Sequence, residues 1–195
     1  MRKRARKGIT MKTMIFDIND DIDVLIDALL HGKVGAMPCD TIYGLSAIAN
    51  EKTSERIFEL KKRPQNKNLI TLTDFDHLDS GLIVPEVLHD IWPAPLTAIL
   101  ARKDGGKTVA VRIPADPFIL EVVKRVGPIW STSCNISGEP SLSTFDEIVK
   151  VFGGEADFIV KKEMRAGGMA STLVDFTSVP WRVLRQGAFD FSPFI

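Results

Sequence analysis

Apolar residues along the chain follow two different spacings, which predict an alternation of helices and strands. Isoleucine and leucine recur every three or four residues over 22–30, as on one face of a helix, and Gly32 ends that stretch. A later helix is indicated by Thr144 and Glu147, which have the spacing of a capping box. Helices are expected over residues 22–30 and 116–126, from near Thr53 to before Pro64, and from Ser143 or Thr144 onward.

Short apolar runs between polar residues predict β-strands. These runs are residues 13–18, 34–38, 69–73, 97–101, 109–113, 128–133, 157–162, 171–176 and 182–187. Residues 39–45, CDTIYGL, are expected to form a loop after the second strand. Because strands and helices alternate irregularly, the predicted fold class is α/β (α+β), with helices packed on a twisted, mixed β-sheet.

Length and composition fit a single domain. The chain has 195 residues, of which 45% are hydrophobic and 26% charged, and no apolar run approaches the roughly 20 residues of a membrane-spanning helix. No membrane association and a cytoplasmic location are therefore expected. Residues 1–12 are basic, and we expect a disordered leader there; a nucleic-acid-binding arm is the alternative. Residues 13–195 are expected to form the domain.

The residue types needed for several common chemistries do not occur together. Cys39 and Cys134 form no CxxC motif, so no residue is assigned as a metal ligand and neither thiol as a nucleophile. The segment KDGGKT resembles the end of a Walker A loop, but Ala101 stands where that motif requires glycine. A serine hydrolase has no support, because the chain lacks a GxSxG motif.

Hydroxyl, amide and cationic side chains gather instead where the predicted strands and helices end. The segments are residues 39–45, 60–68, 108–112, 131–141 and 167–172. Such side chains suit the binding of a phosphate and a carboxylate. Each segment also has an ordinary explanation. Lys61 and Arg63 could be a solvated pair at a helix end, the serine-rich segment a turn, and Arg112 half of a structural salt bridge.

Taken in order, these segments resemble the YrdC-like threonylcarbamoyl-AMP synthases from about residue 15 to residue 190. The motifs that carry the resemblance are MPCDTIYGL, Lys61 with Arg63, WPAPLT, VAVRIP, Ser133 with Asn135, ASTLVD and LRQG. Each motif is weak alone, but all of them occur in the order of the family. Cys39 replaces a threonine of the family pattern, and Ala94 replaces a glycine.

The resemblance implies a YrdC-like fold with a concave ligand-binding face and the activity of a nucleotidyltransferase. Such enzymes condense L-threonine, bicarbonate or CO2, and ATP to threonylcarbamoyl-AMP and pyrophosphate, for threonylcarbamoyladenosine formation in tRNA. Mg²⁺ on the phosphates and a downstream tRNA threonylcarbamoyl-transferase are implied with this activity. Direct contact with RNA is compatible with it but not required.

The family motifs also imply which residues form the site. Those expected to face threonine are Thr41, Arg112, Ser131 and Ser171. Those expected to face ATP are Arg63, Lys67, Thr108, Ser133, Ser141 and Arg185. The catalytic set is Lys61, Arg63, Ser133 and Asn135.

Two other functions stay open at this point. Some relatives carry a histidine near Leu72 that contacts threonine; leucine offers no hydrogen bond, so adenylation of a different amino acid is one alternative. The other is an RNA-binding or ribosome-associated module. Cations embedded among serines and threonines favour a small anionic ligand, whereas RNA binding favours cations interleaved with aromatic residues, and the chain has one tyrosine.

Overall fold

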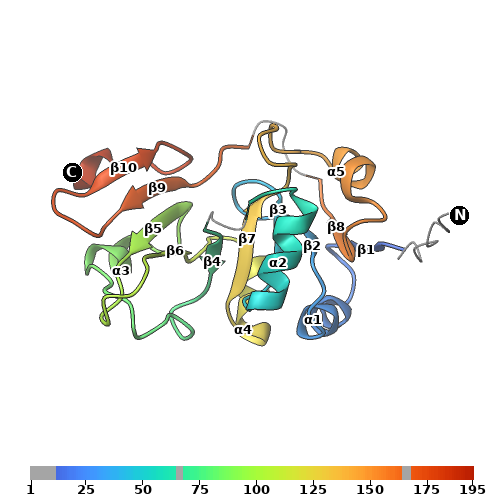
Figure 1. Cartoon of the computed structure of the whole chain (residues 1–195), viewed down its shortest axis with the longest axis horizontal. Helices are drawn as coiled ribbons and strands as arrows, with labels where there is room; N and C mark the ends of the chain where they lie inside the picture. The colour runs from blue at the N-terminus through green and yellow to red at the C-terminus, as the bar shows by residue number, and fades with distance from the viewer. Residues whose placement is uncertain (1–11, 65–67, 164–167) are drawn as a thin grey trace, which may run out of the picture.

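The computed structural model describes residues 12–64, 68–163 and 168–195, and in them ten strands form one sheet (Figure 1). The strand order is β1-β8-β2-β3-β7-β4-β6-β5-β9-β10, with both parallel and antiparallel neighbours. The strands are β1 (Met14–Asp17), β2 (Gly35–Met37), β3 (Gly44–Ile48), β4 (Ile70–Leu72), β5 (Leu96–Leu100), β6 (Val109–Arg112), β7 (Ile129–Ser133), β8 (Phe158–Lys161), β9 (Thr172–Asp175) and β10 (Arg182–Arg185). The predicted mixed sheet is confirmed. The expected leader, apart from Lys12, lies outside the described residues.

Helices cover both faces of the first half of this sheet. They are α1 (Ile22–Leu30), α2 (Glu51–Leu60), α4 (Pro117–Val126) and α5 (Phe145–Phe152). The short helix α3 (Val87–Ile91) packs with the C-terminal part of the chain. The buried faces of α1 and α4 pack with Leu72 and Ile129 of the sheet. Those of α2 and α5 pack with Leu45 and Ile159. On β8, Ile159 lies between Phe158 and Val160, which pack with α1 and α4. Successive strand residues point to opposite faces, so the two helix pairs lie on opposite faces of the sheet.

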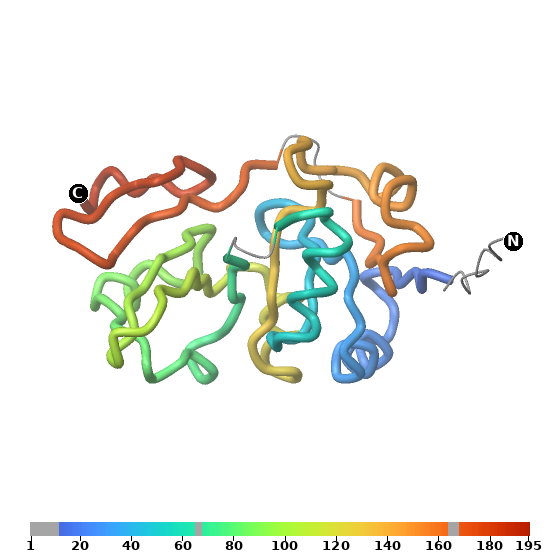
Figure 2. The backbone as a smooth tube through the Cα atoms, in the orientation of Figure 1, coloured from blue at the N-terminus to red at the C-terminus, as the bar shows by residue number. Residues whose placement is uncertain are grey.

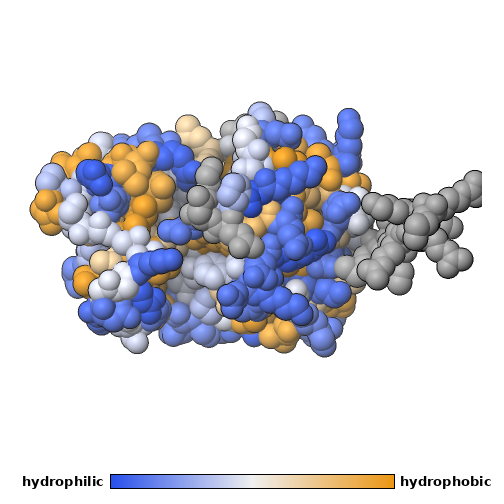
Figure 3. All heavy atoms as spheres, in the orientation of Figure 1, coloured by the Kyte–Doolittle hydropathy of each residue, from blue (hydrophilic) through white to orange (hydrophobic). Residues whose placement is uncertain are grey.

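A third apolar cluster holds the C-terminal part of the chain together. Leu88 of α3, Leu96 of β5, Val174 of β9 and Phe191 pack in it. Figure 2 shows that β1 and the C-terminal segment lie at opposite ends of the molecule. The face viewed in Figure 3 is mainly hydrophilic, with apolar patches at the C-terminal end on the left and on the right-hand side.

Most predicted helix ends are confirmed, and one helix begins slightly earlier than the residue named in the prediction. Thr144 caps α5, and the capping box with Glu147 is present. Helix α2 begins at Glu51 rather than near Thr53, because the Asn50 side chain accepts a hydrogen bond from the Thr53 backbone N–H at 3.0 Å. An N-cap bonds the second or third helical residue, and Thr53 is the third residue of the helix, within its first turn.

Helix α3 and strand β3 were not predicted from the sequence. Helix α3 is five residues long, too short to show a helical period. The expected loop 39–45 is wrong at its end, because Gly44 and Leu45 begin strand β3, which pairs with β7. The segment GLSAI mixes glycine and serine with apolar residues, and it becomes a strand by pairing with β2 on one side and β7 on the other.

Candidate functional site

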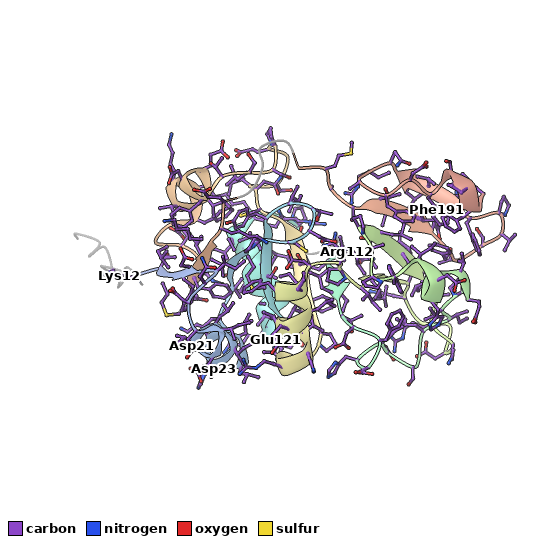
Figure 4. The ribbon with its side chains drawn as sticks, turned by 180° about the vertical axis from the view of Figure 1, so that it is seen from behind. Lys12, Asp21, Asp23, Arg112, Glu121 and Phe191 are labelled. Carbon is purple, nitrogen blue, oxygen red and sulfur yellow. The ribbon has the colours of Figure 1, made fainter. Side chains whose placement is uncertain are left out.

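A cavity of about 420 Å³ opens on the sheet face that carries Leu72. Figure 4 shows Arg112, one of its residues, near the middle of the molecule. Nine of the residues expected from the sequence line it: Thr41, Arg63, Thr108, Arg112, Ser131, Ser133, Ser141, Ser171 and Arg185. Lys67 lies outside the described residues. Lys61 and Asn135 do not line the cavity and lie behind its wall.

The floor of the cavity is apolar and crosses several strands. Ile70 of β4, Ala110 of β6 and Ile99 of β5 are register partners, so their side chains form one row on the same face. Leu173 of β9 adds to this floor. A Cβ atom on Gly44 would lie 2.5 Å from Ser131 Oγ, so glycine is needed there for the strand to approach Ser131.

Arg112 is held at one side of this floor, and it is 4% exposed. Its Nη1 donates to Thr41 Oγ1 at 3.1 Å, and its Nη2 donates to Cys39 Sγ at 2.9 Å. Nη2 also lies 3.3 Å from a carboxylate oxygen of Asp40, so the salt bridge considered from the sequence exists. The Nε–H is buried without a partner among the described residues. An anionic ligand would satisfy that donor.

The Cys39 thiol takes the place of a hydroxyl in this network. It donates to Asp40 Oδ1 at 2.9 Å and accepts from Arg112, which are the two bonds a threonine hydroxyl could make. Burial is the main cause that raises the pKa of Cys39 to about 12, and burial raises that of Cys134 likewise to about 12. Neither thiol is therefore poised as a nucleophile.

Both cysteines are expected to be inert to a disulfide reagent such as Ellman's reagent while the protein is folded. Reaction should appear only after denaturation, because the thiols are buried and their thiolate forms are disfavoured.

Cys39→Thr should keep activity within about threefold of wild type, since the hydroxyl replaces both bonds. Fast labelling of the native protein at Cys39 would contradict this account of the Arg112 network.

A second arginine faces the cavity from β10. Arg185 donates from Nε and Nη2 to the Ser171 carbonyl oxygen, at 3.1 and 2.8 Å. The Ser171 hydroxyl lies 2.8 Å from the hydroxyl of Thr97. Burial, and then the charge of Arg112, lowers the pKa of Arg185. Two like charges therefore share one cavity, and an anion between them would relieve their repulsion.

Arg63 is the third arginine of the cavity and follows α2. Its Nη1 donates to Thr132 Oγ1 and its Nη2 to the Asn68 carbonyl oxygen, each at 3.2 Å. Its Nε–H is buried without a partner among the described residues, and burial lowers its pKa. The lining that the structure describes thus holds three arginines and no carboxylate. Such a lining suits an anionic ligand.

Lys61 and Asn135 support the cavity wall from behind. Lys61 is 2% exposed, and its Nζ donates to the carbonyl oxygens of Ser133 and Asn135 and to Asn135 Oδ1. Burial, and then the charge of Arg63, lowers the pKa of Lys61 to about 8. Lys61 and Arg63 are close in the sequence, but only the fold shows that Lys61 faces inward and Arg63 faces the cavity.

Three further residues belong to this site without having been singled out from the sequence. Asp40 pairs with Arg112, Thr97 contacts Ser171, and Thr132 accepts from Arg63. Asp40 and Thr97 lie inside quoted motifs and Thr132 lies in the polar segment 131–141, so a signal was present, but neighbouring residues were assigned to the site instead. Within the described ranges, no group of three or more acidic, histidine or cysteine residues is arranged to hold a metal, and no helix is long and apolar enough to cross a membrane.

Comparison with known proteins finds relatives with the same fold. A threonylcarbamoyl-AMP synthase of Pyrococcus abyssi is 32% identical over 196 residues, covering 90% of this chain and 58% of the relative. One of Vibrio parahaemolyticus is 28% identical, covering 86% of this chain and 100% of the relative. The chain thus spans less than two thirds of the Pyrococcus relative and the whole of the Vibrio relative.

Solved structures and a family model agree with these relatives. The structure of Pyrococcus abyssi Sua5 complexed with L-threonine matches with a TM-score of 0.84 and 31% identity, over 93% of this chain and 60% of that chain. Escherichia coli YciO matches with a TM-score of 0.82 and 25% identity, over 94% and 100%. A family model for Sua5, YciO and YrdC, described as telomere recombination, matches residues 27–187. Since that range contains every described residue of the cavity, the chain belongs to the Sua5/YciO/YrdC family.

Proposed function

We propose that this protein is an L-threonylcarbamoyladenylate synthase, which condenses L-threonine, bicarbonate or CO2, and ATP to threonylcarbamoyl-AMP and pyrophosphate. The observation that carries the proposal is the cavity with three arginines, many hydroxyls and no carboxylate among its described lining residues. Such a cavity suits a ligand with several negative charges, as ATP and an amino-acid carbamate have. The similarity to synthases, one of them solved with L-threonine, supports this choice of ligand.

The threonine end of the cavity is assigned to Arg112, Thr41, Ser131 and Ser171. Arg112 is assigned to bind the carboxylate, because it lines the cavity and its Nε–H has no partner among the described residues. Ser131 Oγ accepts from Ser46 at 3.3 Å, and Thr41 Oγ1 accepts from Arg112, so each hydroxyl keeps its own proton to donate to the ligand. Short hydroxyl partners of this kind suit the hydroxyl and carboxylate oxygens of threonine.

The nucleotide end is assigned to the remaining cavity residues and to Lys67. They are Arg63, Thr108, Ser133, Ser141 and Arg185. Arg63 and Arg185 supply positive charge on either side of the apolar floor of Ile70 and Ala110, which suits a flat base. Phosphate charge near Arg63 would satisfy its buried Nε–H.

The reaction requires positioning more than acid–base chemistry. An oxygen of the N-carboxythreonine carboxylate attacks the α-phosphorus; a new P–O bond forms, and the bond to the leaving pyrophosphate breaks. Both reactants are anions, so Arg63, Arg112 and Arg185 are assigned to hold them together and to offset the charge. When bound with ATP, Mg²⁺ would neutralise phosphate charge further. The hydroxyl-rich lining fits a magnesium nucleotide whose other ligands are phosphate oxygens and water.

Leu72 supports a narrower alternative, in which the amino acid is not threonine. Leu72 pairs with Arg112 across β4 and β6. An amino acid held by Arg112 would therefore present its side chain to an apolar neighbour. The downstream transferase, the tRNA product and a cytoplasmic location follow from the proposed synthase activity. An RNA-binding module would draw on the basic leader, most of which lies outside the described residues.

An amino-acid panel tests this proposal. Pyrophosphate release from ATP and bicarbonate is measured with L-threonine, L-serine and L-valine. Threonine is expected to support release at least about 10-fold better than valine, because Ser131 and Thr41 can bond its hydroxyl and valine leaves them unpaired. A better response to another amino acid would replace threonine as the substrate. No response to any amino acid, with ATP bound, would remove the synthase assignment.

A further inference from the structure

The hydrogen bonding of Ser133, a residue of the cavity lining, is set by its neighbours. Its Oγ lies 2.7 Å from Asn135 Oδ1. The Asn135 side chain is fixed at both ends, because Lys61 Nζ donates to Oδ1 at 2.6 Å and Nδ2 donates to the Glu139 carbonyl oxygen. An ammonium group has no acceptor, so Lys61 determines which end of the amide is the oxygen.

This arrangement fixes the direction of the Ser133 proton. Asn135 Oδ1 can only accept, so the hydrogen bond between the two side chains uses the proton of Ser133. Ser133 lines the cavity, and what its hydroxyl offers there is lone pairs. A phosphate oxygen also carries lone pairs, so it is a poor partner for this hydroxyl. A cation is a suitable partner, as in P-loop enzymes, where a serine or threonine hydroxyl binds the nucleotide's Mg²⁺.

We propose that Ser133 Oγ is a direct ligand of the Mg²⁺ that accompanies the bound nucleotide, with Lys61 and Asn135 as positioning residues that turn its proton away from the cavity. This inference rests on the proposed binding of ATP. Lys61 and Arg63 are positively charged and close by, so a bare cation is repelled and the metal enters with phosphate. The lack of a carboxylate in the described lining agrees with a metal held mainly by phosphate oxygens and water.

A cysteine substitution at Ser133 tests the metal contact by binding rather than by activity. Affinity for α,β-methylene-ATP is measured calorimetrically in Mg²⁺ and in Cd²⁺, a softer ion that prefers sulfur. Ser133→Cys is expected to lose about 10-fold in Mg²⁺ and to recover most of that loss in Cd²⁺. Cys39 and Cys134 are buried and do not compete for the added ion.

The matched control is Ser141→Cys, which adds the same thiol elsewhere on the cavity. It should show no Cd²⁺-specific recovery. If Ser133→Cys weakens binding equally in both ions, the hydroxyl contacts phosphate and the inference is overturned. Failure of wild-type protein to bind the analogue would instead remove the proposed nucleotide site. If the wild type releases pyrophosphate with threonine but Ser133→Cys shows no gain in affinity in Cd²⁺ over Mg²⁺, only the proposed contact between Ser133 and the metal is overturned.

The positioning role is tested separately with Asn135→Leu, which removes the acceptor and releases the Ser133 proton. The affinity for α,β-methylene-ATP is measured once in Mg²⁺ and once in EDTA. The ratio of the first affinity to the second should fall by about 10-fold, although Ser133 itself is intact. Affinity in EDTA should stay the same or rise, because the free hydroxyl can now donate to phosphate. An unchanged ratio would contradict the role of Asn135. Loss of affinity in both conditions to the same extent would also contradict it.

Discussion

Arg112→Leu is expected to lower kcat/KM for threonine by about 100-fold or more, the largest effect of any substitution on the amino-acid side. A buried, charged hydrogen-bond donor to a carboxylate contributes about 1.5–3 kcal/mol, and leucine also leaves Asp40 without its cation. The effect should appear in KM for threonine and kcat, with little change in the affinity for ATP. Steady-state kinetics with each substrate varied in turn measures this division.

Two controls separate this effect from loss of folding. Arg112→Lys keeps the positive charge but loses the paired N–H donors of the guanidinium group. It should recover part of the activity, leaving a deficit of about 10-fold. Arg125→Leu removes an arginine from an exposed pair with Asp23 at the end of α4, and should match wild type. Equal KM values for threonine in Arg112→Leu and wild type would show that Arg112 does not bind the amino acid.

Lys61→Met is expected to reduce activity by about 100-fold, although Lys61 does not line the cavity. The substitution removes the Lys61 donor from two carbonyl oxygens and from Asn135 Oδ1, which keeps only the Ser133 hydroxyl as a donor. Each buried acceptor left unsatisfied costs about 1–3 kcal/mol. The loss should fall on ATP binding and kcat, while KM for threonine changes little. Lys103→Met, which removes an exposed lysine, is the matched control and should be near wild type.

The lowered pKa of Lys61 gives this residue a distinct pH signature. Activity of the wild type should fall above about pH 8, where the buried ammonium loses a proton and one of its hydrogen bonds. The contribution of Lys61 to the free energy of unfolding changes in the opposite direction with pH. Between about 8 and the 10.5 of an unfolded lysine, the unfolded chain binds more protons, so this group raises the free energy of unfolding as pH rises. An alkaline fall in activity that coincides with unfolding would contradict the assignment to Lys61.

Local patterns were enough to predict elements whose ends are chemically marked. The helix over 22–30 and the capping box at Thr144 were both confirmed, because periodicity and capping depend on neighbours in the chain. Strand β3 was missed, since Gly44–Ile48 becomes a strand through its pairing with β7, far along the sequence. That pairing is not encoded in the segment itself.

The site shows the same limit. The motifs were sufficient to predict nine residues that the fold brings to one cavity. They could not show that Lys61 faces inward while Arg63 faces the ligand, because this depends on where the turn at 133–135 lies against the end of α2. Nor could they show the partners of Arg112, since Asp40 and Thr41 meet it only after β6 is placed in the sheet.

The most direct test of the proposed synthase is the formation of a labelled adenylate. Purified protein is incubated with Mg·ATP and radiolabelled bicarbonate, with and without L-threonine, and the products are separated at once. The account predicts a labelled species containing AMP and threonine that appears only with threonine, together with an equal amount of pyrophosphate. Pyrophosphate without a threonine-dependent labelled adenylate, or no product from protein shown to bind ATP, would contradict it.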